Sequence, residues 1–237
     1  MKKLITLMAA LSLALVPLTA SAQFGLGKKK NKFDTKPINQ LLGDIDKVVD
    51  EYEGATENVR TATETVQNII KGYADGEFPV LTKPWAEIRK EINEAKDDAA
   101  RTAAVELSNK YLLEIEERKK AVEAFLADPA KAADIQGKLQ PPEVEQLNQI
   151  VASMKPVPEQ DAQLIKRSTD LTAKAATGVA DLTKQIGSNP LKANDYKKLI
   201  NKLNTGMEKL NQIPTELNKQ VDAIKTMLAN LDKLLIK

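Results

Sequence analysis

Apolar side chains recur every three or four residues along most of this chain, which is the spacing of one face of an α-helix. The clearest run extends from Leu41 to Tyr73 and keeps this spacing without exception. A seam sustained over several heptads is typical of helices that pack lengthwise against other helices. It predicts a long first helix, built on Leu41, Ile45, Val48, Tyr52, Ala55, Val59, Ala62, Val66, Ile69 and Tyr73.

A second helix is predicted over residues 84–127. The proline that opens this range suits a first helical turn, where its missing N–H costs nothing, and the Asp128-Pro129 pair suits the end. Glutamates four residues before a basic residue, such as Glu114 before Arg118, indicate the solvated face. A helix of about 44 residues would span about 66 Å. A compact globule of this size has a radius of gyration of only about 17 Å, so the length predicts an elongated molecule.

Proline and glycine divide the rest of the chain into helical segments. An irregular connection is expected over residues 129–142. It leads into helical patterns over residues 143–155 and 159–186, and Pro156 and Pro158 stand between these two patterns. The third long helix should therefore be broken near these prolines.

The last helix is predicted to be long and kinked. Its apolar seam starts near Tyr196 and stays in phase to Leu235, although Pro214 stands inside it. Because the phase is preserved, one kinked helix is favoured over two, even though an interior proline costs about 3 kcal/mol. The complete pattern predicts an all-α fold: an elongated, mostly antiparallel bundle of about four long, coiled-coil-like helices, the third broken near Pro156 and Pro158 and the last kinked at Pro214.

The first 22 residues have the parts of a secretory signal peptide. Lys2 and Lys3 precede an apolar run, and Ala20-Ser21-Ala22 supplies small residues for cleavage. The alternative, a membrane anchor, is disfavoured because the apolar run is shorter than the roughly 20 residues that a span needs. We expect cleavage after Ala22 and a periplasmic or secreted protein. A bacterial lipoprotein is excluded because no cysteine stands at the cleavage site. The expected organisation is a signal peptide at 1–22, a flexible basic tail at 23–37 and one elongated helical-bundle domain at 38–237.

The chain contains no histidine and no cysteine. Serine–histidine–aspartate triads, histidine-ligated metal centres, disulfides and thiol chemistry are therefore excluded. Neither a metal nor another cofactor is expected, and no catalytic grouping is recognised. The remaining carboxylates leave only a carboxylate-dependent peptidoglycan-cleaving enzyme as a catalytic alternative. Such a groove normally uses aromatic platforms, which are scarce in this chain.

Charge is balanced overall but uneven along the chain. Once the two lysines of the signal are removed, 33 basic residues face 33 acidic ones, so a nucleic-acid partner is not expected. Residues 23–36 and residues 190–237 are each basic, and the segment between them is acidic. This distribution favours an acidic first helix beside the basic last helix.

Two groups of residues are candidate contact sites. Tyr73, Phe78 and Trp85 surround the loop between the first two helices. Their rings either close the end of the bundle and join both helices, or form an apolar tip for a partner or a lipid surface. The second group lies in the tail, where basic residues either remain solvated or touch an anionic membrane or envelope surface. These residues are Lys28, Lys29, Lys30 and Lys32.

The leading functional hypothesis is an exported, non-catalytic helical protein that acts through protein–protein interaction, self-association included, or as a structural envelope factor. The alternative is a peripheral protein that binds a membrane or an envelope polymer through the lysine tail and the aromatic tip. In outline only, such a bundle resembles helical pore-forming toxin components, periplasmic sensor bundles and coiled-coil envelope chaperones. No specific motif links this chain to any of these families.

Overall fold

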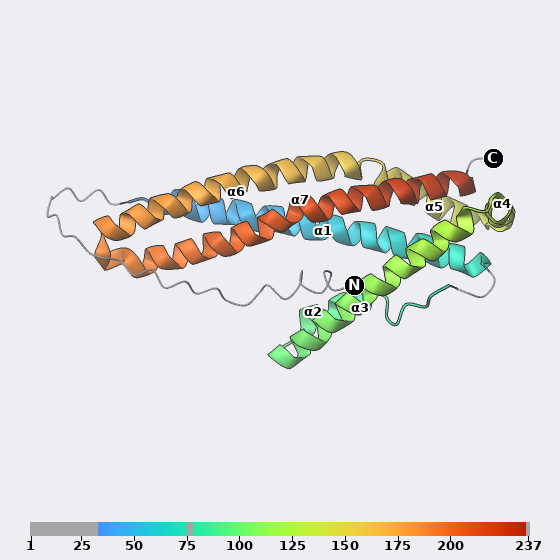
Figure 1. Cartoon of the computed structure of the whole chain (residues 1–237), viewed down its shortest axis with the longest axis horizontal. Helices are drawn as coiled ribbons and strands as arrows, with labels where there is room; N and C mark the ends of the chain where they lie inside the picture. Colours follow the sequence, from blue (N-terminus) through green and yellow to red (C-terminus); the bar gives the residue numbers. More distant parts are fainter. Residues whose placement is uncertain (1–32, 75–77, 236–237) are drawn as a thin grey trace. The chain divides into compact units, whose positions relative to one another are not determined.

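The computed structural model describes residues 33–74 and 78–235, and every regular element in these ranges is helical. The predicted all-α class is therefore confirmed for the described chain. The described residues from Asp34 onward belong to one compact unit. The elements in Figure 1 are α1 (Lys36–Tyr73), α2 (Trp85–Glu94), α3 (Asp98–Leu126), α4 (Pro129–Lys138), α5 (Pro141–Met154), α6 (Val157–Ser188), the 3₁₀ turn η2 (Pro190–Lys192) and α7 (Ala193–Leu235).

Helices α6 and α7 form an antiparallel pair joined by η2, and they lie side by side (Figure 1). The break between α5 and α6 falls at Lys155 and Pro156, as the prolines predict. Along α6 the buried residues alternate steps of four and three, which is a heptad seam. They are Val157, Asp161, Leu164, Ser168, Leu171, Ala175, Gly178 and Leu182.

The predicted apolar seam of α7 consists of two columns of residues, and in each column the residues are seven positions apart. One column is buried as predicted, whereas the buried residues of the other lie one position earlier than predicted. α7 continues through Pro214 as one helix of 43 residues, as predicted. The predicted second column, for example Met207 and Leu228, is only half-buried. The stripe shifts because α7 packs against both α6 and α1, so two neighbours set its centre. The buried residues are Tyr196, Leu203, Gly206, Leu210, Ile213, Leu217, Ile224, Met227, Asn230, Leu231 and Leu234.

Helix α1 packs against α6 and α7 at two glycines. A Cβ atom added at Gly178 would lie 3.1 Å from the Cδ1 atom of Ile38, and one added at Gly206 would lie 3.1 Å from Cγ2 of Ile45. Only glycine therefore admits α1 without displacing these isoleucines. The expected packing of the first helix beside the last helix is confirmed, because α1 contacts α7. The ion pairs of α1 nevertheless go elsewhere, from Glu51 to Arg167 of α6 and from Glu57 to Arg89 of α2.

The second half of α1 takes part in a larger apolar core. There it meets the end of α3, the short helices α4 and α5, and the last turns of α7. Ile70, Ile135, Leu147 and Leu231 are fully buried in this core. The segment 129–142, expected to be irregular, instead contains α4. Its first turn is stabilised by the Asp128 carboxylate, which accepts a 2.9 Å hydrogen bond from the backbone N–H of Ala130.

The prediction of one helix over residues 84–127 is wrong. The chain breaks at residues 95–97, where the Asp97 side chain caps α3 by accepting a 2.8 Å hydrogen bond from the N–H of Ala100. Contacts of Thr82 with Glu114 and of Trp85 with Tyr111 place α2 antiparallel to α3. The alanine-rich middle of the predicted helix would have buried little apolar area. The fold-back of α2 on α3 buries the Trp85 ring instead. We call residues 78–126 the α2–α3 hairpin.

Candidate functional site

A group of interacting polar side chains joins α1 to the α2–α3 hairpin. At its centre is Glu64 of α1, whose Oε2 atom accepts hydrogen bonds of 3.2 Å from the backbone N–H of Trp85 and 3.2 Å from the hydroxyl of Tyr111. The two rings are buried and stack in a tilted arrangement, with centroids 5.3 Å apart. One carboxylate therefore holds both helices of the hairpin.

Two arginines complete this group, which we call the Glu64 junction. The guanidinium of Arg60 lies 4.3 Å from the centroid of the Trp85 ring, a cation–π distance. Arg118 is 1% exposed, and its Nη2 atom donates a 2.8 Å hydrogen bond to Oδ1 of Asn68. Burial lowers the pKa of both guanidinium groups, and attraction to Glu64 opposes this effect at Arg118.

Sequence reasoning missed this junction. It placed Arg118 with Glu114 on the solvated face of a helix. In the structure Arg118 is buried, whereas Glu114 accepts a 2.8 Å hydrogen bond from the N–H of Thr82. The available signal was the position of Arg118 in phase with Tyr111 and Val122 on one face of α3. A charged residue on an apolar face normally has a buried partner.

The chemistry of the junction is that of an anchor. Burial, followed by the proximity of Glu64, raises the pKa of Tyr111, so its hydroxyl stays protonated and donates to Glu64. Gln67 of α1 adds a 3.3 Å hydrogen bond from Nε2 to the carbonyl oxygen of Ile115. Because these groups engage one another, the junction fixes the hairpin on α1.

The hairpin also carries most of the exposed large apolar side chains in the described ranges. Leu113 is 61% exposed and Val80 is 69% exposed. Single exposed apolar residues are common on protein surfaces, but several on one element are typical of a contact site. The four on the hairpin are Val80, Ile92, Val105 and Leu113, and the fifth exposed residue, Leu191, lies in η2.

The structure places the three candidate aromatic residues in separate surroundings. Tyr73 is half-buried, and its hydroxyl donates a hydrogen bond to Glu143 of α5, which raises the pKa of the tyrosine. Phe78 packs edge-on against Phe125 with ring centroids 5.8 Å apart, and Trp85 belongs to the Glu64 junction. The aromatic rings thus connect helices in this structure. The candidate lysines Lys28, Lys29, Lys30 and Lys32 lie outside the described residues.

A wide groove separates α4 from α5. Its walls combine the apolar residues Leu139 and Val144 with the amides of Asn148 and Gln149, and Glu145 is the acidic residue in its lining. The groove is open and has a volume of about 950 Å³. Its lining brings together no pair of acid and base that suggests a reaction.

Within the described ranges, no group of three or more acidic side chains is placed to hold a metal ion. No helix in the same ranges is long and apolar enough to cross a membrane. Comparison of the chain with protein-family models, with curated proteins and with solved structures found no match.

Proposed function

We propose that this protein acts without catalysis, by presenting a helical surface to a protein partner, and that the α2–α3 hairpin carries this surface. The observation that supports the proposal is the concentration of exposed apolar side chains on the hairpin. Ile92 of α2 and Val105 of α3 are 39% and 43% exposed. Such side chains lose unfavourable contact with water when a partner covers them.

The Glu64 junction supports the same proposal in a second way. A contact element gains affinity when it is already ordered, because less conformational entropy is lost on binding. Trp85 and Tyr111 are buried between the helices, and their shared acceptor Glu64 belongs to α1. The hairpin is therefore fixed on α1, while its exposed apolar side chains stay accessible to a partner.

The proposal includes an exported protein and a bundle of long antiparallel arms. Export is supported by the signal-like pattern of residues 1–22, with cleavage after Ala22. On this proposal the mature chain works in the periplasm or outside the cell. The bundle is supported by the heptad spacing of buried residues in α6 and α7. Self-association and a separate partner protein both fit such arms.

The test uses a photo-reactive amino acid at position 109, between Val105 and Leu113 on α3, in cells that produce the full chain. A crosslinked species should form there. It should be lost when Val105→Ser and Leu113→Ser are combined. The matched control is Leu191→Ser, which removes an equally apolar side chain that is 97% exposed elsewhere. Light scattering of the purified mature chain then distinguishes a second copy from another protein.

The proposal fails if position 109 forms no crosslink while the chain is folded and monomeric. It also fails if the double serine variant crosslinks as well as the original chain. Circular dichroism of each variant checks that the helices are retained. Amino-terminal sequencing of the processed protein tests export separately, because Gln23 should be the first residue.

A further inference from the structure

The turn between α6 and α7 presents an apolar side chain fully to solvent. Leu191 in η2 is 97% exposed, more than any other large apolar residue in the described ranges. Burying a leucine side chain is favourable, so this position forgoes that gain in the isolated protein. The turn itself does not need leucine, because Pro190 and the preceding Asn189 supply its turn chemistry.

Four lysines follow this leucine in the sequence. Residues 190–202 contain four lysines and a single acidic residue, Asp195. None of these lysines forms an ion pair with another described residue. A lysine at the start of a helix gains nothing from the helix dipole, which favours acids there. The four exposed lysines are Lys192, Lys197, Lys198 and Lys202.

The tertiary structure brings the start of α1 to the same end of α7. Gly178 lies against both Ile38 of α1 and Leu203 of α7, so the three helices share one level there. Lys36 then stands near the level of Lys202, within one turn of the start of α1. Lys36 is exposed and lies far from Lys202 in sequence, so it adds one further positive charge at this end of the fold.

We propose that this end, η2 with the first turns of α7, docks on an anionic lipid bilayer. Leu191 enters the region between the lipid headgroups, and the neighbouring lysines contact lipid phosphates. Each lysine near such a surface strengthens binding about fivefold at moderate ionic strength. A single inserted leucine adds a similar factor, so binding is reversible and depends on salt. This inference goes beyond the protein-binding role, because it uses a different element from the hairpin.

The experiment measures co-sedimentation of the mature chain, residues 23–237, with phosphatidylcholine vesicles that contain or lack phosphatidylglycerol. The chain should bind only the vesicles with phosphatidylglycerol. Changing Lys192, Lys197, Lys198 and Lys202 to Gln should weaken binding at least about tenfold. Leu191→Ser should weaken it about tenfold, which is the lower end of the gain from burying a leucine side chain.

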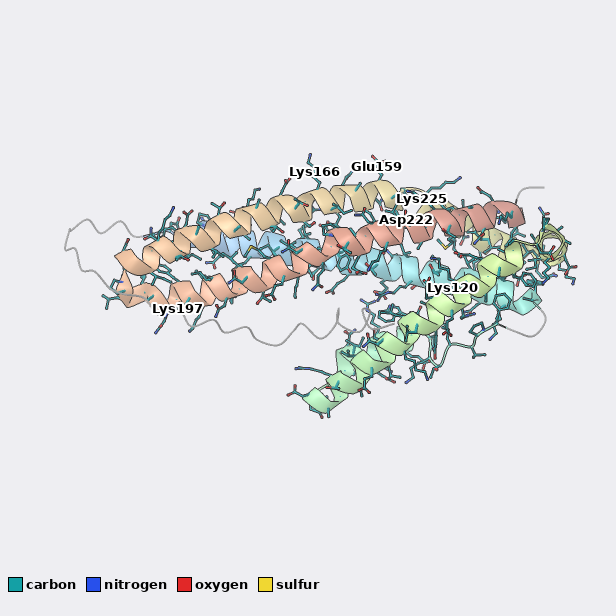
Figure 2. The ribbon with its side chains drawn as sticks, viewed as in Figure 1. Lys120, Glu159, Lys166, Lys197, Asp222 and Lys225 are labelled. Carbon is teal, nitrogen blue, oxygen red and sulfur yellow. The ribbon has the colours of Figure 1, made fainter. Side chains whose placement is uncertain are left out.

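Two controls match these variants in charge and in apolar loss. Four exposed lysines elsewhere, Lys120, Lys155, Lys166 and Lys174, are changed to Gln together. Figure 2 shows Lys120 on α3 and Lys166 on α6, whereas Lys197 lies near the start of α7. Leu113→Ser removes a leucine that is 61% exposed on the hairpin. Both controls should change vesicle binding by less than about twofold.

The docking proposal is overturned if the mature chain does not bind the anionic vesicles, or if the control lysines matter as much as those of α7. It is also overturned if the α7 lysine variant loses vesicle binding but Leu191→Ser binds vesicles normally. That result would indicate a contact that any polyanion could make, without insertion of a side chain into the lipid. The hairpin crosslink is scored in the same variants. Its persistence in the Leu191 and α7 lysine variants separates failure of docking from failure of the protein-binding proposal.

Discussion

The side-chain amide of Gln220 donates a 3.0 Å hydrogen bond from Nε2 to Oδ2 of Asp161, and this contact joins α7 to α6 inside their shared seam. Asp161 is 1% exposed, and its Oδ1 atom has no hydrogen-bond partner in the structure. Burial therefore raises the pKa of this carboxyl group. Each residue stands six positions after a disruption of its helix, Lys155 for Asp161 and Pro214 for Gln220. The polar pair thus lies at a similar distance from the break before α6 and from the proline inside α7.

Replacing Asp161 by Asn should stabilise the protein at neutral pH by about 1 kcal/mol. Above the raised pKa that Asp161 has in the folded state, its ionised carboxylate destabilises the fold by the full cost of burying the charge. This cost disappears below the pKa of an aspartate in the unfolded chain, about 3.9. The stability gain of the variant should therefore shrink as the pH falls from about 8 toward 4. Urea unfolding of both proteins across this range measures the difference. A gain that is independent of pH, or a gain equal to that of the exposed control Asp222→Asn, would contradict the assignment.

Replacing Pro214 by Ala should stabilise α7. Proline inside a helix lacks the N–H that would bond to Leu210 and crowds the preceding turn, at a cost of about 3 kcal/mol. Part of this gain is lost because alanine leaves the unfolded chain freer, so we expect about 1 to 2 kcal/mol. Pro158→Ala is the control, since Pro158 stands in the first turn of α6, where proline is tolerated. Equal effects of the two changes in urea unfolding would contradict the prediction.

Glycines in the middle of helices should respond oppositely to a larger side chain. Gly54 is exposed in α1, and a Cβ atom there meets nothing within 4 Å, so Gly54→Ala should stabilise by about 0.5 to 1 kcal/mol. Gly206→Val should destabilise by about 1 to 3 kcal/mol because its side chain meets Ile45. Thermal unfolding of the two variants decides the matter. A destabilised Gly54 variant or an unaffected Gly206 variant would show that the helices pack differently.

Removing the carboxylate of Glu64 should loosen the α2–α3 hairpin. Glu64→Ala leaves the Tyr111 hydroxyl without its acceptor and Arg118 without its nearby counter-charge, at a cost of about 3 kcal/mol. Trp85 is the sole tryptophan, so its fluorescence reports this site alone. Its emission should shift to longer wavelength, and amide exchange should rise across α2 and α3. Unchanged emission in Glu64→Ala, with Glu117→Ala as the exposed control, would show that the junction is not an anchor.

The agreement between sequence and structure differs among the helices for a physical reason. Part of the α6 seam and one column of α7 were predictable because helical periodicity is a local property, repeated over many turns. The α6 seam also contains Asp161, Ser168 and Gly178, which an apolar pattern does not mark. The break before Pro156 was predictable for the same reason, since proline acts on its own turn. The break at Asp97 was not, because a continuous helix and a capped hairpin satisfy similar local preferences. The burial of Trp85 against Tyr111 decides between them, and the distance between these residues along the chain hides it.

By itself the amino-acid sequence determined that the chain is helical, where part of each long apolar stripe lies and that histidine and cysteine chemistry is absent, because these depend on residue type and on spacing within a few turns. Only the tertiary structure decided which helices share a core. It placed Arg118 inside, turned α2 back on α3, and set Lys36 near the level of Lys202. Each of these outcomes results from contacts between segments distant in sequence, whose free energy no local pattern contains.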